Sequence, residues 1–235
     1  MTETYDASEP VVLADEENIN ETDDVPEEES IDAGERTRAE FENPDAGSDV
    51  TATAETADPA FANLDPNNVV PRKLLDEALA FFQANRARIP RHTHISILDY
   101  SKRSTERRFH VIDMTTGQVL SLRMSNGRGS EPVHNGFATR FGNVPGSNRS
   151  SLGFALTAET YHGKHGLSLR LDGLSPTNSR MRSRAVVVHG AKYVRDEAVV
   201  QGRSNGCPAV PMPQKDTLIN LIKGGTLMFA GLSQG

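Results

Sequence analysis

The only cysteine of the chain, Cys207, lies in a polar turn with two glycines, Gly202 and Gly206. A structural cysteine usually lies in an apolar run, where its thiol behaves as a small hydrophobic group. Gly206 lets the backbone take conformations closed to other residues, so the turn can present the sulfur and direct successive N–H groups at one point. An oxyanion hole requires that arrangement. The pattern indicates a cysteine nucleophile, with a plain turn cysteine as the alternative.

A thiol with a pKa near ~8.5 is only a few per cent thiolate at neutral pH, so it needs a base. Among seven histidines His189 fits this role best, because it ends the apolar run 186–188 and precedes Gly190, where the chain must turn. Catalytic groups are commonly mounted where a rigid sheet holds them. Cys207 follows His189 by 18 residues, in a loop that can fold back over it. We predict that His189 is the general base; a structural histidine is the alternative.

The pattern of apolar residues predicts a mostly β body that holds these two side chains. Apolar residues at helical spacing predict a peripheral helix from Pro71 to Pro90, and Asp216 is expected to cap a second helix over 217–223. The glycine- and serine-rich span 125–151 is predicted to be a long functional loop. Short runs of strand-forming residues bounded by turns are 95–100, 109–113, 119–124, 152–157, 167–171, 185–189 and 226–230.

Charge divides the chain into an acidic N-terminal part and a basic body. Residues 1–70 contain 21 acidic and two basic side chains, a formal charge of −19, whereas residues 71–235 carry +12. A segment of low hydrophobicity and high net charge cannot offset an ordering cost of about 1–2 kcal/mol per residue. We therefore predict a disordered acidic tail over 1–66, a helical segment packed on the body over 67–90, and a catalytic domain over 91–235.

Composition also limits the location and the partners of the protein. The first 30 residues are acidic and lack the basic start and apolar stretch of a secretory signal. No run of about 18 apolar residues suits a membrane span. A single cysteine excludes an internal disulfide, so cysteine usage does not reveal the compartment. The arginines of the basic body are dispersed, aromatics do not interleave with them, and tryptophan is absent, so we expect no nucleic-acid partner.

Two segments of the body resemble the L,D-transpeptidase signature, in which a strand-end His-Gly is followed by Ser-His-Gly-Cys. These segments are Val188-His189-Gly190 and Ser204-Asn205-Gly206-Cys207. The span 202–209 resembles the branch of murein L,D-transpeptidase catalytic domains (YkuD-like), where Gly-Arg-Ser-x-Gly-Cys-Pro-Ala stands in place of the commoner motif. Segments 141–143, 150–153 and 169–174 also resemble that branch, and the resemblance covers about 90–230.

The resemblance implies an L,D-transpeptidase-like β-sandwich with peripheral helices, and an enzyme that acts on peptidoglycan without a cofactor. In that family the cysteine attacks the amide between the third and fourth residues of a stem tetrapeptide, releases D-alanine and forms a thioester. An amine from a neighbouring stem then gives a 3→3 cross-link. Water in place of the amine gives L,D-carboxypeptidase activity, which is the first alternative. A non-catalytic wall-binding module with a vestigial cysteine is the second.

Carried onto this chain, the resemblance makes Cys207 the nucleophile and His189 the base, with the backbone carbonyl of Gly190 orienting the imidazole. It also implies an oxyanion hole lined by the N–H groups of Asn205, Gly206 and Cys207. Each of these positions matches the family motif except Asn205, where the motif has a second histidine. The backbone N–H of Asn205 remains available to that role.

A second departure from the motif follows the nucleophile. Pro208-Ala209 replace the stretch that supplies an arginine two residues after the cysteine. Arg203 or another basic residue is expected to fill the place of that arginine. The side chains expected to border the substrate cleft are Tyr161, His162, Arg203 and Ser204.

A zinc peptidase is a rival interpretation, because His162 and His165 stand at a spacing that suits zinc, with Asp172 or Cys207 as further ligands. Gly166 indicates a turn rather than a helical metal face, so we expect no metal and place both histidines at the cleft. The expected partners are peptidoglycan stem tetrapeptides. As the resemblance implies, the protein is expected to act as a monomer in the cell envelope or periplasm, in wall biogenesis and cell shape.

Overall fold

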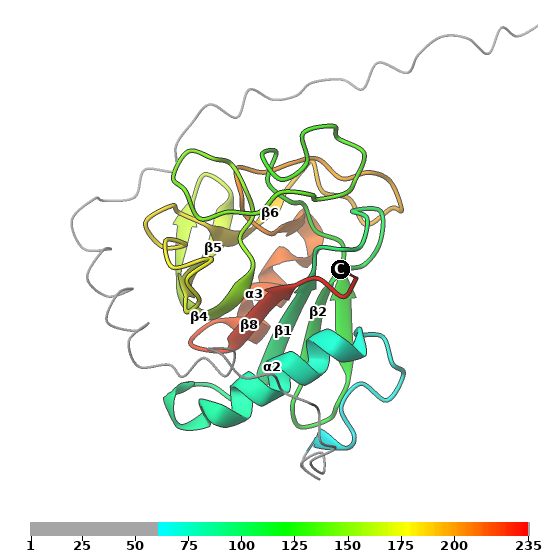
Figure 1. Ribbon diagram of the computed structural model, residues 1–235, viewed down its shortest axis with the longest axis vertical. Coiled ribbons are helices and arrows are strands. Elements are labelled where there is room, and N and C mark those ends of the chain that lie inside the picture. Colours follow the sequence, from blue (N-terminus) through cyan, green and yellow to red (C-terminus); the bar gives the residue numbers. More distant parts are fainter. Residues whose placement is uncertain (1–60, 235) are drawn as a thin grey trace, which may run out of the picture.

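The computed structural model describes residues 61–234, which form one eight-stranded sheet with helices packed on it (Figure 1). The mostly β fold with peripheral helices is thus confirmed; the predicted tail up to residue 60 lies outside the described residues. The strands run in the order β3-β2-β1-β8-β4-β5-β6-β7 across the sheet. Their bounds are β1 (His94–Asp99), β2 (Phe109–Asp113), β3 (Val119–Leu122), β4 (Gly153–Gly163), β5 (Gly166–Gly173), β6 (Val187–Ala191), β7 (Ala209–Pro211) and β8 (Leu227–Gly231). The helices are α2 (Arg72–Ala84) and α3 (Lys215–Ile222), with the 3₁₀ turns η2 (Arg86–Arg88) and η3 (Met212–Gln214).

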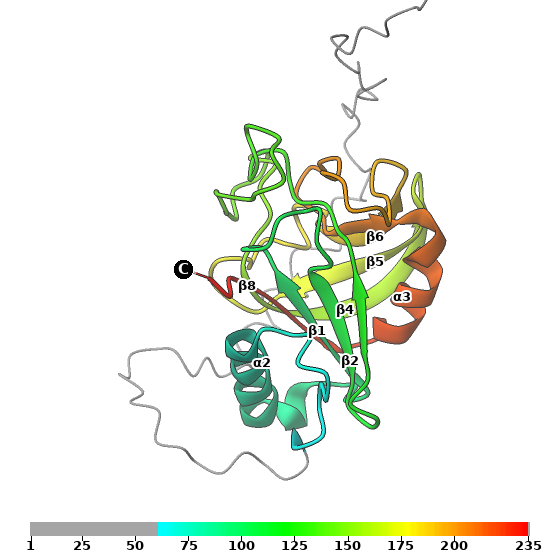
Figure 2. The ribbon, with the colours of Figure 1, turned by 90° about the vertical axis from the view of Figure 1, so that its right-hand side faces the viewer.

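Helix α2 packs across one face of the sheet, because its apolar residues share one side (Figure 2). Phe81 of this helix stacks on Phe154 of β4, with ring centroids 3.9 Å apart. The helix ends at Ala84, before the predicted end at Pro90, because Asn85 leaves helical geometry with a φ of −114° and the chain turns into η2. The buried residues of α2 are Leu74, Leu75, Ala78, Leu79, Phe81 and Phe82.

Two hydrophobic cores lie on the two faces of the sheet. The core under α2 includes Ile95 and Ile97 of β1, whereas the other core draws on all eight strands and on α3. Val188 of β6 belongs to this second core. Since side chains alternate between the faces of a strand, the next residue, His189, faces away from α3. The burial of Val188 therefore directs the predicted base to the other side of the sheet.

The edge of the sheet is a parallel pair, β6 and β7, in which His189 is aligned with Ala209. The sequence analysis does not predict strand β7. Its three residues directly follow Pro208 and end at Pro211, and proline rarely occupies a strand. Strand β6 begins later than predicted. Ala185 has a φ of +52°, a left-handed conformation that does not continue a strand.

Two further predictions are corrected by the structure. Helix α3 begins at Lys215, one residue before the predicted Asp216 cap, so Asp216 lies in its first turn and Gln214 is the N-cap residue. Residues 61–66, assigned to the acidic tail, pack against the body. Leu64 belongs to the core under α2, and the Asp65 carboxylate accepts the N–H groups of Val69 and Val70 at 2.9 and 2.8 Å.

Candidate active site

The thiol of Cys207 lies against the backbone that leads into β6. Its sulfur accepts the N–H of Val187 at 3.4 Å, and its S–H donates to the carbonyl oxygen of Ala185 at 3.7 Å. The residue is 7% exposed. The sulfur is thus held by the segment that begins the histidine-bearing strand, rather than by an apolar core.

Glycine is required at position 206 for two reasons. Its φ is +127°, which side chains rarely adopt. A Cβ at this position would also lie 2.8 Å from the carbonyl oxygen of Arg149. The predicted glycine turn before the nucleophile therefore has a physical cause in both the backbone conformation and the close approach of the 142–151 segment.

Three buried serine hydroxyls fix the turn around Cys207. Ser150 Oγ donates to the carbonyl of Gly206 at 3.2 Å. Ser204 Oγ and Ser125 Oγ donate to the carbonyl of Cys207 at 2.7 and 3.3 Å. Because C=O and N–H point in opposite directions across a trans peptide, the bond from Ser150 directs the N–H of Cys207 away from Ser150. The hydroxyls thereby set the direction of a backbone donor beside the sulfur.

The structure assigns different positions to some predicted site groups. The N–H of Gly206 donates to Ser204 Oγ at 3.1 Å, so in this structure it serves the turn itself rather than an oxyanion hole. Ser204, which was expected to border the substrate cleft, is only 2% exposed, and its hydroxyl bonds to the backbone of the turn instead. The side-chain oxygen Oδ1 of Asn205, in contrast, accepts a hydrogen bond from Arg128 Nε at 3.0 Å. Arg128 is a neighbour of the nucleophile turn that sequence reasoning did not find.

His189 is buried on β6, with Nδ1 3.0 Å from the carbonyl oxygen of Gly190. A carbonyl only accepts, so this bond places the proton on Nδ1 and leaves Nε2 as an acceptor in the neutral ring. Ala209, the partner of His189 across the ladder, lies two residues after Cys207. Two residues span roughly 7 Å of strand, so the register places the imidazole and the thiol at the same end of the parallel pair.

The hairpin between β4 and β5 brings a second imidazole to the site. His165, in the turn of this hairpin, stacks on His189 with ring centroids 4.2 Å apart and planes inclined by 25°. His162, its predicted zinc partner, is exposed near the end of β4 and pairs with Leu167. Within residues 61–234 no group of three or more His, Cys, Asp or Glu side chains is placed to hold a metal ion.

The other predicted cleft residues are held elsewhere. Tyr161 lies beneath Arg170, whose guanidinium carbon is 4.5 Å from the ring centroid. Arg203 donates from Nη1 to the carbonyl oxygen of Glu131 at 3.0 Å. These side chains are parts of local packing arrangements, and the described contacts do not bring them to the sulfur together.

A buried polar network is hydrogen-bonded to the turn 204–207, which carries Cys207. Arg108 is fully buried and donates from Nη2 to Met124 O and to Asn126 Oδ1. Asn126 in turn donates from Nδ2 to Glu131 at 2.9 Å, and its carbonyl accepts the N–H of Ser204 at 2.9 Å. Burial lowers the pKa of Arg108 to about 10, which keeps it cationic at neutral pH. The network therefore joins a buried charge to the turn that carries the thiol.

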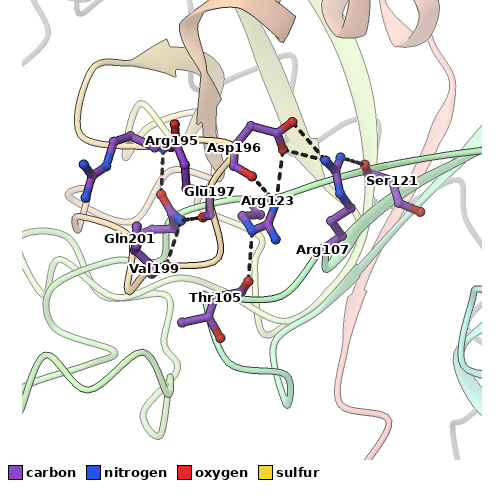
Figure 3. Close-up of polar contacts among 9 residues, drawn as sticks. All are labelled: Thr105, Arg107, Ser121, Arg123, Arg195, Asp196, Glu197, Val199 and Gln201. Atoms are coloured by element: carbon purple, nitrogen blue, oxygen red, sulfur yellow. Dashed lines mark hydrogen bonds and ion pairs between the residues drawn. The ribbon is translucent and has the colours of Figure 1, made fainter.

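The loop between β6 and β7, which leads to Cys207, is bonded to residues that flank β2 and β3 (Figure 3). Asp196 of this loop accepts Arg107 Nη2 at 2.9 Å and Arg123 Nη1 at 3.2 Å. Arg123 also donates to the backbone carbonyl of Asp196 and to Thr105 O. The side chain of Gln201 ties the loop together through Arg195 N–H and the carbonyls of Glu197 and Val199 (Figure 3).

The turn that carries the Cys207 thiol thus leads into β7, and the His189 imidazole lies on the neighbouring strand β6. The model of the L,D-transpeptidase catalytic domain matches residues 66–230, so the chain belongs to that family. Membership supports a peptidoglycan-modifying role and an L,D-transpeptidase-type enzyme at the level of the family. Among residues 61–234, none of the helices combines the length and the apolar character that a bilayer span needs.

Several solved structures resemble the chain. The LD transpeptidase LdtMt1 in complex with imipenem is 14% identical, with 59% of each chain covered and a TM-score of 0.37. The helical cell shape determining protein Pgp2 from Campylobacter jejuni is 9% identical, with 61% of this chain and 49% of that chain covered and a TM-score of 0.36. An L,D-transpeptidase from Xylanimonas cellulosilytica is 17% identical, with coverages of 63% and 69% and a TM-score of 0.34.

The chain spans 59% of the length of LdtMt1 and 49% of that of Pgp2. No curated protein matches the chain in sequence.

Proposed function

We propose that the protein is a peptidoglycan L,D-transpeptidase that forms a thioester at Cys207 and transfers the acyl group to an amine of a second stem peptide. The observation that supports this best is the register of β6 and β7, which aligns His189 with the strand that follows Cys207. Membership of the L,D-transpeptidase catalytic domain family supplies the substrate class.

The proposed reaction begins with a proton transfer from the Cys207 thiol to Nε2 of His189. The thiolate attacks the carbonyl carbon of the amide between the third and fourth residues of the donor stem. The resulting oxyanion is stabilised by the N–H groups of Cys207 and Asn205. Collapse breaks the C–N bond, and His189 gives its proton to the leaving amine of D-alanine, which leaves a thioester on the sulfur.

The second half of the reaction repeats this chemistry with an acceptor amine. The amine attacks the thioester carbonyl, His189 takes its proton, and the C–S bond breaks to release the 3→3 cross-linked product and the thiolate. Gly190 keeps the imidazole in the tautomer that both halves need, through its carbonyl at Nδ1. Water as the acceptor gives a tripeptide instead, which is the carboxypeptidase alternative.

The location and assembly of the protein follow from the same proposal. A transpeptidase of this class acts in the cell envelope or periplasm, on stem tetrapeptides of the wall, and contributes to wall biogenesis and cell shape. We propose that it acts as a monomer without a cofactor. The arrangement of one domain over 91–235, with the helical segment 67–90 packed against it, is part of the same proposal.

Mass spectrometry of muropeptides after incubation with the purified protein tests the proposal. Wild type should produce 3→3 dimers and release D-alanine, and Cys207→Ala should produce neither. Tripeptides without dimers would replace the transpeptidase by the carboxypeptidase. Unchanged muropeptides, together with retention of the protein on isolated walls, would favour a binding module.

A further inference from the structure

The nucleophile turn has a cationic neighbour that the family motif does not supply. Arg184 lies just before β6, and its Nη2 would be 3.4 Å from a Cβ built on Gly206. The same nitrogen donates to the carbonyl oxygen of Arg149 at 2.6 Å. The guanidinium therefore lies beside the residue that precedes Cys207, although Arg184 stands 23 residues before Cys207 in the chain.

The contacts of Arg184 fix its position but do not neutralise its charge. Nη1 donates to Gly142 O at 3.0 Å and to Ser151 Oγ at 2.8 Å, and Nη2 donates to Arg149 O. All three acceptors are uncharged oxygens. Burial lowers the pKa of Arg184, and the charge of Cys207 acts in the opposite direction. A guanidinium stays protonated in proteins, so a fixed positive charge lies near enough to Cys207 for the two side chains to interact electrostatically.

The backbone after Arg184 holds the sulfur from the same side. Ala185 adopts a φ of +52°, a conformation that costs a non-glycine residue energy and tends to occur at functional sites. Its carbonyl accepts the thiol S–H, and the N–H of Val187 donates to the sulfur. The strained turn at Ala185 thus allows one short segment, 184–187, to aim both a side-chain cation and a backbone donor at Cys207.

Other titratable groups near the thiol come from four segments of the chain. His189 lies on β6, and His165 stacks on it from the hairpin. Tyr100, directly after β1, interacts with the charge of Cys207, but burial raises its pKa, so its phenol is neutral at physiological pH. Arg128 reaches the turn through Asn205. Arg184 is accordingly a permanent cation beside the glycine that precedes the sulfur.

We propose that Arg184 is a positioning residue that stabilises the thiolate of Cys207 and takes the place of the arginine that the family motif carries two residues after the cysteine. The proposal rests on the proposed function for its role in the reaction. Arg203, which was expected to fill that place, is engaged with Glu131 O instead. An opposite charge within ~4–6 Å favours the charged form of an ionisable group, commonly by about one pKa unit or more.

The test measures the rate of iodoacetamide alkylation of Cys207 against pH, by intact mass, on the full chain. Arg184→Met should raise the midpoint of the profile by about one pH unit, so that alkylation at pH 7 slows about tenfold. Arg184→Lys keeps the charge and should keep the midpoint close to that of wild type. Arg180→Met is the matched control, since it removes an exposed arginine from the same loop, and it should leave the midpoint unchanged.

Two outcomes would overturn the proposal. One is an unshifted midpoint in a folded Arg184→Met protein. The other is a midpoint in Arg184→Lys as high as that of Arg184→Met, which would mean that the loop contacts rather than the charge matter. If the methionine variant does not fold, the lysine variant is compared with wild type, and a midpoint about one pH unit above that of wild type overturns the proposal. Alkylation does not depend on peptidoglycan turnover, so an inactive wild type with a shifted Arg184→Met midpoint would overturn the proposed function and leave the role of Arg184 standing.

Discussion

The imidazoles of His165 and His189 stack with their centroids 4.2 Å apart. This contact joins the tip of the β4–β5 hairpin to the strand that carries the proposed base. Together with the bond from Nδ1 of His189 to Gly190 O, it restricts rotation of the His189 ring. The orientation of the base thus depends on one neighbour in its own strand and on another that is 24 residues earlier.

Loss of the base should be far more costly than loss of its stacking partner. His189→Gln should keep the fold and reduce kcat by roughly 10²–10⁴-fold, the range for a positioned acid–base group. His165→Gln removes only a contact that orients the ring and should reduce kcat about tenfold or less. His162→Gln, which alters an exposed side chain, is the control. Muropeptide kinetics would contradict the assignment if His189→Gln were as active as His162→Gln.

The thiol of Cys207 should react faster with iodoacetamide at pH 7 than free cysteine does, because backbone and cationic groups stabilise its thiolate. A carbapenem should acylate the same sulfur, as family membership leads us to expect. Cys207→Ala should abolish turnover and cost about 1 kcal/mol of stability, since the turn is held by serine hydroxyls. Intact-mass measurements that found Cys207 inert to both reagents would refute a nucleophilic role.

His110 should make the fold sensitive to acid. Burial lowers its pKa from 6.5 to about 4, and Nε2 has no hydrogen-bond partner among the described residues. Between pH 6.5 and pH 4 the unfolded chain binds a proton at His110 and the folded chain does not. The contribution of neutral His110 to the free energy of unfolding is therefore fully present above pH 6.5 and is lost as the pH falls towards 4. The loss amounts to about 3 kcal/mol. Urea unfolding of His110→Gln should show a weaker dependence over this window than wild type, and an equal dependence would contradict the prediction.

The Asp196 contacts should matter more for activity than for stability. Arg123→Met removes the bonds to Asp196 and Thr105 and should release the β6–β7 loop, lowering kcat/KM about tenfold through misplacement of the nucleophile. Arg107→Met is the control, because its side chain is 43% exposed against 13% for Arg123 and its ion pair is weaker. Equal kcat/KM values for the two variants would show that the contacts of Arg123 with the β6–β7 loop do not affect activity.

Removal of residues 1–60 should leave a folded and active protein. The cut must precede Phe61, since Leu64 and Asp65 pack against the body. At low salt the basic remainder should bind anionic wall fragments more tightly than the full chain does. The difference should fade towards ~0.5 M NaCl, because exposed charges are screened over about 10 Å already at 0.1 M salt. Unfolding of the shortened protein would show that the acidic segment belongs to the domain.

The sequence predicts most strands because they depend on local runs of apolar residues. A glycine turn and a strand-end histidine are local patterns too, and they lead to the candidate nucleophile and the candidate base. Arg184 and Ser150 could not be predicted, since their roles depend on contacts between segments far apart in the chain. The predicted end of the tail at residue 66 lies too late in the chain. Leu64 is buried by its packing with α2, which the acidic residues around it in the sequence do not indicate. The turn at Gly206 can be predicted from the residue type alone, whereas the hydrogen bond from its N–H to Ser204 Oγ depends on the conformation of the turn and cannot.

The position of β8 has a consequence for the order in which the site is assembled. This strand follows Cys207 in the chain, yet it lies between β1 and β4 and joins β1–β3 to β4–β7. Before β8 pairs, each part has an open edge. The bond from Ser125, which follows β3, to the carbonyl of Cys207 connects the two parts, whereas Ser150 directly precedes β4 in the second part. The carbonyl of Cys207 therefore receives its second serine donor, Ser125, when the two parts are joined, which links the final geometry of the turn to the completion of the sheet.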